Sequence, residues 1–416
     1  MKELEVQKRK GYKKTKLGWI PETWKLMSID EITERVTNRV AVDPSKDYQE
    51  IGIRSHGKGI FHKEKVQGKT LGNKRVFWIE SGCFTVNIVF AWEQAVAKTT
   101  DKEVGMIASH RFPMYKPKKG ILELEFLLYF FKTALGKHLL GLASPGGAGR
   151  NKTLGQKTFG QTKIPVPSIN EQKKIIELIL KWDQSIQLTD ALTKSKTSIL
   201  EAHLANLLSP PMDAKDLKYW KKIKLSEIGQ MTKGKGITKK ELTLTGIPCI
   251  RYGEIYSKHH VYLKKFESHI SSEIASSSKQ LEKGDILMAG SGESIDEIGK
   301  SIAYCKDETA YAGGDIIILR PSREVNSIYV SLALNSSYAN RQKRKMGQGN
   351  SIVHIYASNL KKLEIWLPSI NMQNRIANFF KVSDKEIEIL RNKLLNLKKQ
   401  KSGIMNTIIL GKYHKL

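Results

Sequence analysis

Apolar residues recur in alternating steps of about four and three over the last fifty residues of the chain. They are Ile376, Phe380, Ile387, Leu390, Leu394, Leu397, Ile404 and Ile408. This spacing is typical of a helix that packs along a heptad seam. It predicts a helix of ~35–40 residues, roughly 55–60 Å long at ~1.5 Å per residue, within the segment 367–416.

A weaker seam in the same phase lies near the middle of the chain. Its apolar positions are Ile175, Ile179, Trp182 and Ile186. Pro167 lies just before this seam and Pro210 follows it, which predicts a first long helix within 166–210. Two such seams in one chain favour an antiparallel coiled coil, although each helix could instead pack only on its own domain.

Both long helices belong to an internal repeat. Val166–Gln172 recurs 201 residues later as Leu367–Gln373, and Trp24–Ile32 recurs 196 residues later as Trp220–Ile228. The segments between these matches diverge almost completely. A period near 200 residues is too long for a solenoid and indicates a two-fold domain duplication.

A further match concerns helix length. Lys196–Leu200 is most similar to Lys401–Met405, 205 residues later. Compared with the 201-residue offset, this predicts that the second helix is longer by four residues, about one turn.

The divergent segments, 1–165 and 211–366, show the pattern of α/β domains. Runs rich in β-branched and aromatic residues predict strands, and short apolar runs after the late strands predict helices. The predicted strands are Arg75–Ile79, Phe84–Phe90, Ile247–Ile250, Gly284–Met288 and Asp315–Arg320, and the predicted helices are Leu124–Ala134 and Ile328–Asn335. The sequence therefore predicts two α/β domains of one fold, related by a pseudo-two-fold repeat.

Composition adds a strong positive charge. The 416 residues include 70 Lys plus Arg against 41 Asp plus Glu, a formal charge of +29. Such an excess favours a polyanionic partner, here nucleic acid rather than a membrane surface. The three cysteines lie far apart, which argues against a disulfide scaffold and fits a reducing compartment. No signal peptide or spanning segment stands out, so we expect a soluble, cytoplasmic protein.

Known catalytic motifs are incomplete in this sequence. Gly299–Ser301 resembles the end of a P-loop, but position 294, where the loop needs glycine, is Ser294. No H-E-x-x-H zinc motif, nucleotide fingerprint or nucleophile elbow is present. These observations favour a binding protein without catalytic residues, metal or cofactor. An enzyme with an unrecognised site stays open as an alternative.

Basic segments rich in glycine and amides precede each long helix. Lysine and arginine supply phosphate contacts, and arginine, asparagine and glutamine also read base edges. Arg54 and Arg251 further occupy corresponding places in the two halves. The predicted DNA-binding residues are Arg54, Lys58, Arg150, Asn151, Lys152, Arg251, Arg341, Lys343, Arg344, Lys345, Gln348 and Asn350. The alternative for each is an ordinary solvated surface residue.

Taken together, these features resemble the specificity subunit of type I restriction-modification systems. The resemblance rests on Leu17–Trp24, on Pro167–Gln172 before a long helix, on the repeat of that motif and on the two divergent halves. Two departures are visible. The second half opens with Lys218–Trp220 instead of a Gly-Trp-Ile-Pro lead, and Met372 replaces the glutamate of the first copy.

The resemblance implies that each divergent block is a target recognition domain that reads one half of a split double-stranded DNA target. It implies that the helices space the domains and dock two methyltransferase subunits that bind S-adenosylmethionine and methylate adenine. Restriction subunits with motor activity would use ATP and Mg. The chain itself would catalyse nothing. A stand-alone sequence-specific DNA-binding regulator is the alternative that would need no enzyme partner.

Overall fold

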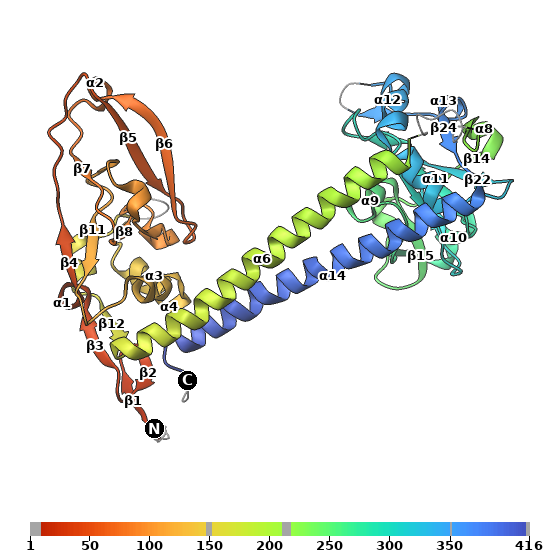
Figure 1. Ribbon diagram of the computed structural model, residues 1–416. Helices are drawn as coiled ribbons and strands as arrows, with labels where there is room; N and C mark the ends of the chain where they lie inside the picture. Colours follow the sequence, from red (N-terminus) through yellow and green to blue (C-terminus); the bar gives the residue numbers. More distant parts are fainter. Residues whose placement is uncertain (1–9, 147–151, 210–217, 350–351, 413–416) are drawn as a thin grey trace. The chain divides into compact units, whose positions relative to one another are not determined.

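The computed structural model describes residues 10–146, 152–209, 218–349 and 352–412, and the chain divides into two compact units (Figure 1). The first unit comprises Met1–Asp190 together with Asn392–Leu416, and the second comprises Ala191–Arg391. Each unit therefore combines one globular domain with part of each long helix.

The domain of the first unit contains two four-stranded sheets. Their strand orders are β6-β5-β10-β7 and β4-β11-β8-β9, and only the β10–β5 pair is parallel among the pairs of these sheets. The strands are β4 (Thr33–Val36), β5 (Asp47–Ile53), β6 (Ile60–Gln67), β7 (Val76–Trp78), β8 (Phe84–Val86), β9 (Val96–Lys98), β10 (Ile107–Ser109) and β11 (Met114–Pro117). The helices are α1 (Ile29–Ile32), α2 (Gly68–Leu71), α3 (Leu124–Lys132), α4 (Ala134–Leu142) and α5 (Gln156–Gly160).

The domain of the second unit repeats this arrangement. Its sheets have the orders β16-β15-β21-β17 and β14-β22-β18-β20, with β15–β21 as the parallel pair. The strands are β14 (Gly229–Lys233), β15 (Ile247–Ile250), β16 (Ser268–Ile270), β17 (Lys279–Gln280), β18 (Ile286–Ala289), β20 (Ser301–Ala303), β21 (Tyr311–Ala312) and β22 (Ile316–Pro321). The helices are α8 (Leu225–Ile228), α9 (Tyr252–Ser257), α10 (Ser272–Ser277), α11 (Ser327–Leu334), α12 (Ser337–Met346) and α13 (Ala357–Leu360).

The two domains have the same topology. In one sheet of each domain the three neighbouring strand pairs are antiparallel, parallel and antiparallel, in that order. In the other sheet all three pairs are antiparallel. A shared topology under divergent sequences is what a domain duplication produces. The predicted fold class, two α/β domains of one fold in a pseudo-two-fold repeat, is confirmed.

A small antiparallel sheet closes each domain at its two ends. In the first unit β3 (Lys25–Ser28) pairs with β12 (Lys163–Val166), and Lys25 lies opposite Val166. In the second unit β13 (Lys221–Lys224) pairs in the same way with β24 (Glu364–Leu367). The chain therefore enters and leaves each domain at neighbouring points.

The two long helices have equal lengths. Helix α6 spans Ile169–Leu207 and α14 spans Ile370–Ile408, 39 residues each, which confirms the predicted length. The prediction that the second helix is one turn longer was wrong. Lys196–Leu200 and Lys401–Met405 lie at different depths in helices of equal length, and a sequence match cannot distinguish such a shift from an insertion.

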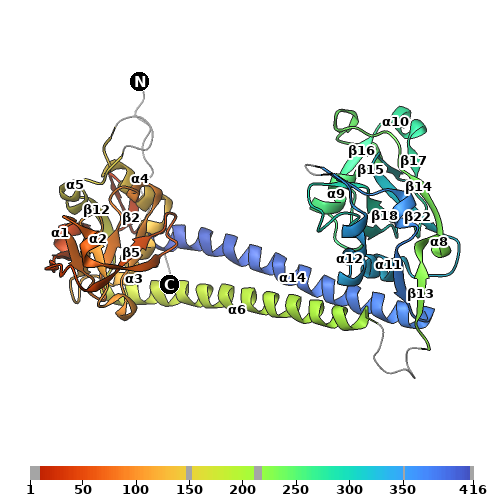
Figure 2. The same cartoon turned by 90° about the horizontal axis from the view of Figure 1, so that it is seen from above.

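Within each unit, helices α6 and α14 run in opposite directions. In the first unit, Ile179 of the α6 start belongs to one core cluster with Ile408 from the α14 end. In the second unit, Leu200 of the α6 end clusters with Phe380 of the α14 start. The pairing is therefore antiparallel, and both helices run on without a break (Figures 1 and 2). All twelve predicted seam residues are buried or half-buried.

The repeated Pro-Ser-Ile-Asn-x-Gln motif fastens each long helix to its domain. The buried Gln172 side chain accepts a hydrogen bond from the backbone N–H of Glu123, which precedes α3, at 2.8 Å. Gln373 accepts one from the N–H of Asn326, which precedes α11, at 3.0 Å. Each amide also donates to the carbonyl of the proline five residues before it. Buried polar groups need such partners, so the glutamine fixes the start of each long helix.

Among the described residues, no helix combines the length and the apolar character needed to cross a membrane.

Candidate nucleic-acid interface

An isolated antiparallel bridge closes a hairpin shortly before each long helix, at an equivalent place in the two units. In the first unit Gly146 pairs with Lys152, and in the second Gln348 pairs with His354. The base of each hairpin is held by one backbone bond to the loop that leaves a central strand. These bonds run from Leu154 N–H to the Ile88 carbonyl at 2.8 Å and from Ile355 N–H to the Gly290 carbonyl at 2.9 Å.

The hairpins carry several predicted contact residues. Lys152 holds its ammonium over the Trp92 ring at 5.6 Å, and Gln348 is exposed. Arg150, Asn151 and Asn350 lie outside the described residues. For these positions a DNA contact stays a prediction.

Arg54 and Arg251 follow equivalent strands, β5 and β15, as their sequence correspondence predicted. The exposed Arg54 stacks over the ring of Phe61 at 4.7 Å. This stacking limits its rotamers and holds a cation at the turn that also carries the exposed Lys58. Arg251 is half-buried and lies 3.7 Å from a carboxylate oxygen of Glu254, so part of its charge is balanced within the domain.

The basic run on α12 divides into outward and inward residues. Arg341 and Lys345 are exposed, with no ion pair among the described residues. Arg344 is also exposed, but its Nε lies 2.9 Å from the carboxylate of Asp296. Arg341 and Lys345 are therefore the cations of this run best placed for phosphate.

The structure contradicts the predicted DNA contact of Lys343. Its side chain is only 1% exposed, and its ammonium donates to the backbone carbonyl of Gly299 at 3.0 Å. Burial lowers the pKa of Lys343 from its ordinary 10.5 to about 7, because the charged amine loses its hydration and has no carboxylate partner. A residue enclosed in this way cannot neutralise a DNA phosphate.

The lowered pKa of Lys343 predicts how stability depends on pH. Between pH 7 and 10.5 the unfolded chain binds this proton and the folded chain does not, so the free energy of unfolding should rise with pH. The slope from this one group is at most ~1.4 kcal/mol per pH unit. We expect Lys343→Met to remove that slope and to raise stability at pH 7. Urea unfolding of both proteins at pH 7, 8 and 9 measures it, and equal slopes would contradict the buried neutral amine.

A basic hollow of about 520 Å³ on the first unit was not predicted from the sequence. Its rim carries exposed cations from three separate segments, and the rings of Phe90 and Phe112 add apolar surface. The cations are Lys63, Lys74, Arg75 and Arg111, and the imidazole of His110 also belongs to the lining. Lys63 and Lys74 share the carboxylate of Glu50 at 3.5 and 3.8 Å. Arg75 and Arg111 have no ion pair within the part of the chain that the structure describes.

Strand pairing creates this hollow. Strands β7 and β10 are antiparallel, and the N–H of His110 donates to the carbonyl of Arg75 at 3.1 Å. The N–H of Ile88, in the loop after β8, donates to the carbonyl of Arg111 at 3.0 Å. Two short basic pairs, Lys74–Arg75 and His110–Arg111, thereby become neighbours. In a chain with 70 Lys and Arg residues, two adjacent basic residues do not stand out in the sequence. Only the strand pairing shows that these two pairs are neighbours.

Arg75 and Arg111 are expected to contribute directly to DNA binding by the first unit. A bidentate base contact is worth ~1–3 kcal/mol, and the loss of one phosphate contact lowers the slope of log affinity against log salt concentration by about one. We predict that Arg75→Ala with Arg111→Ala weakens binding to the preferred duplex at least ~10-fold. Titration of labelled DNA at several salt concentrations measures this. The exposed pair Lys69→Ala with Lys119→Ala removes the same charge elsewhere, and an equal loss there would refute a specific role for the arginines.

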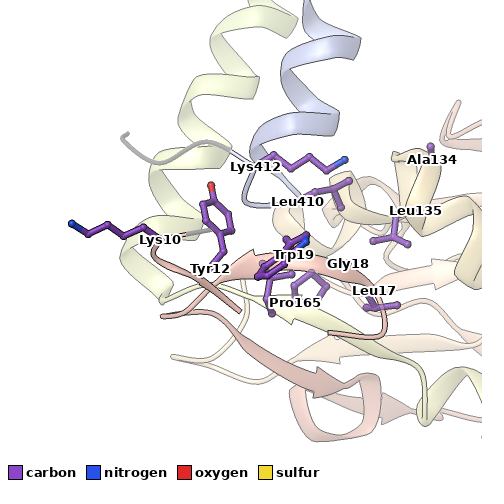
Figure 3. A pocket seen from close by; sticks show the side chains of 11 residues that line it. Lys10, Tyr12, Leu17, Gly18, Trp19, Ala134, Leu135, Pro165, Leu410 and Lys412 are labelled. Atoms are coloured by element: carbon purple, nitrogen blue, oxygen red, sulfur yellow. The ribbon is translucent and has the colours of Figure 1, made fainter. Parts of the chain in front are cut away.

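A second hollow in the first unit, of about 760 Å³, lies beside the N-terminal hairpin β1 (Tyr12–Thr15) and β2 (Gly18–Pro21) (Figure 3). Its lining includes Trp19 and Leu410, from opposite ends of the sequence, with Lys10 and Lys412. Just beyond the end of α14, Gly411 has φ +65°, and a Cβ there would lie 2.4 Å from Pro21. This glycine lets the C-terminal turn close on the hairpin, so the hollow marks a structural junction.

The described residues hold no group of three or more histidine, cysteine or acidic side chains placed to bind a metal ion. What the interface does offer is cations, amides and aromatic rings on equivalent loops of two related domains. That combination suits a phosphate backbone and base edges.

Comparison with known proteins gives consistent matches to one family. Residues 21–195 and 218–399 each match the family described as the type I restriction modification DNA specificity domain. The putative type I restriction enzyme MjaX specificity subunit of Methanocaldococcus jannaschii is 21% identical over 445 residues, 98% of each chain. The MjaVIII specificity subunit of the same organism is 22% identical, covering 98% of this chain and 97% of that one.

Solved structures share the fold. An HsdS subunit from Thermoanaerobacter tengcongensis is 17% identical and superposes with a TM-score of 0.55, covering 95% of this chain and 98% of that chain. A chain from a structural study of type I R-M complex assembly is 18% identical, with a TM-score of 0.62 and coverage of 95% and 99%.

Proposed function

Because this chain belongs to the family of type I restriction modification DNA specificity domains, with one match in each half, we propose that its two units read the two halves of one split DNA target. The first unit reads the first half of the target, and the second unit reads the second half. The chain acts by recognition and contributes no catalytic group of its own. Methylation and cleavage belong to other subunits of the complex.

One observation carries this proposal, namely that two domains of one topology present different chemistry at equivalent loops. Beside the loop after β8 the first unit places Arg75 and Arg111. In the second unit the loop after β18 exposes Glu293 beside the Gln348 hairpin. Arginine suits guanine, glutamine suits adenine, and carboxylates accept from cytosine, so the units are suited to different bases.

The long helices suit a second role as a spacer and a docking surface. Each is an unbroken 39-residue helix, and the domain cores cover only part of its circumference. In the second unit α14 exposes an apolar stripe of Phe379, Val382 and Ile389, with Val382 70% and Ile389 58% exposed. The spacing of three and seven residues places them on one face of the helix. We assign this stripe to contact with a methyltransferase subunit.

The docking role predicts a loss of assembly. Val382→Glu with Ile389→Glu should leave the fold intact, because both side chains face outward, and should abolish co-purification with the methyltransferase subunit. Pull-down from co-expressing cells, with circular dichroism of the variant, measures both properties. Lys398→Glu, exposed elsewhere on α14, is the control. Undiminished co-purification of the double variant would show that the stripe is not the docking surface.

The same experiment separates this function from that of a stand-alone DNA-binding regulator. A regulator would purify without methyltransferase subunits and would still bind its target. Under our proposal S-adenosylmethionine is bound by two methyltransferase subunits, and ATP and Mg are bound by the restriction subunits.

A further inference from the structure

The second unit buries a lysine at the base of its recognition surface. Lys343 lies on α12 within the otherwise exposed basic run, and its ammonium donates to the Gly299 carbonyl at 3.0 Å. An apolar side chain would fill this space without the cost of dehydrating an amine. The contact that distinguishes lysine from such a side chain is the hydrogen bond to Gly299.

Gly299 belongs to the loop 290–300, which connects β18 to β20. It has φ +69°, and a Cβ at this position would lie 2.9 Å from the Cδ of Lys343. The loop thus bends closely around the lysine. Arg344, the next residue of α12, holds the same loop at Asp296 across 2.9 Å. Two consecutive side chains of one helix therefore anchor two points of this loop.

The anchored loop forms one surface with the Gln348 hairpin. Within it β19 (Ser291–Gly292) pairs with β23 (Val353–His354), and the Ser291 hydroxyl lies 2.9 Å from Nδ1 of His354. Among the exposed residues of the loop, Glu293 and Ser294 stand beside a hairpin that exposes Gln348. These are the side-chain types that discriminate base edges.

We infer that Lys343 is a positioning residue for sequence recognition by the second unit: it holds the loop 290–300 against the Gln348 hairpin and thereby fixes which bases the second half of the target must contain. The inference rests on the proposed function, because it takes the second unit to read DNA. Lys343 itself touches no DNA.

The first unit lacks this anchor. The caps of α4 and α12 match, because the Gly136 N–H donates to the Thr133 hydroxyl and the Ala339 N–H donates to the Ser336 hydroxyl. Counted from these caps, Lys343 corresponds to the buried Leu140 of α4. A leucine has no donor with which to hold the loop after β8. The effect of changing Lys343 should therefore be confined to the second half of the target.

The test compares Lys343→Met with Lys345→Met in the full chain, assembled with its partner subunits. Binding is measured against the preferred duplex and against duplexes with single base changes in each half. A base mismatch ordinarily costs ~1–3 kcal/mol, so the wild type should discriminate ~5–150-fold. We expect Lys343→Met to lower discrimination in the second half by ~10-fold while the first half and the salt dependence stay unchanged. Lys345→Met should instead weaken all duplexes evenly and reduce the salt slope by about one.

Two further arms keep the result decisive. Asp296→Ala releases the other anchor of the loop, at an exposed position. We expect this variant to lose discrimination in the same half of the target. It replaces Lys343→Met in the test if Lys343→Met does not fold. Lys343→Arg keeps a donor and should restore part of the discrimination. An unchanged base profile in Lys343→Met and Asp296→Ala, or equal changes in both halves, would overturn the inference. Absence of any sequence preference in the wild type would instead overturn the proposed function.

Discussion

Inserting seven residues into each long helix should lengthen the gap between the two halves of the DNA target by about three base pairs. Seven residues add two turns, or ~10.5 Å, and B-DNA rises ~3.4 Å per base pair. A heptad preserves the phase of the seam. The insertion sites are after Asp190 in α6 and after Arg391 in α14, where the two units divide. Both helices must be extended, because they pair antiparallel.

Mapping of methylated sites in cells that carry this variant measures the gap. The account predicts the same two half-sequences with a longer spacer and no methylation of the original target. In a control that extends α6 alone, the residues of α6 after the insertion are shifted by seven positions relative to their partners on α14. This control should therefore fail to assemble. An unchanged spacer in the doubly extended variant would show that the helices do not set the distance.

Exchanging residues 25–166 for the matching block of another family member should change the first half of the target and leave the second half intact. The structure favours this exchange, because Lys25 and Val166 lie opposite each other in the β3–β12 pair. The junctions therefore fall at one place in the fold. Each unit has its own core cluster, so the exchange leaves the core of the second domain unchanged.

The reciprocal exchange of residues 221–367 is the matched control, since Lys221 and Leu367 are partners in the equivalent sheet. It should change the second half alone. Methylated-site mapping of both chimaeras gives the result. If either exchange altered both halves, the units would not read DNA independently.

The sequence predicted the long helices and the duplication well because both depend on local signals. Heptad spacing at residues such as Ile376 and Phe380 is visible along the chain, and the motif ending in Gln172 recurs at Gln373 because both glutamines make the same buried bonds. The equivalent hairpins could be located for a related reason. They directly precede these repeated motifs, so their positions follow from the repeat.

Residue roles that depend on tertiary contacts were not predictable. Arg75 and Arg111 lie 36 positions apart and become neighbours only through the pairing of β7 with β10 and the loop after β8. Lys343 looked like its exposed neighbours Arg341 and Lys345, and only the packing of α12 shows that it points inward. The direction of each side chain depends on which side of the helix faces the core, and four charges within five residues conceal that side in the sequence.

The most direct test of the central claim, that one chain reads two separate sequences with two domains, is methylated-site mapping of the wild-type complex in a host with and without this gene. We expect one new motif made of two specified half-sequences separated by a spacer of fixed length and free sequence. Arg75→Ala with Arg111→Ala should degrade only the first half of that motif. A continuous motif, or no gene-dependent methylation at all, would contradict the account.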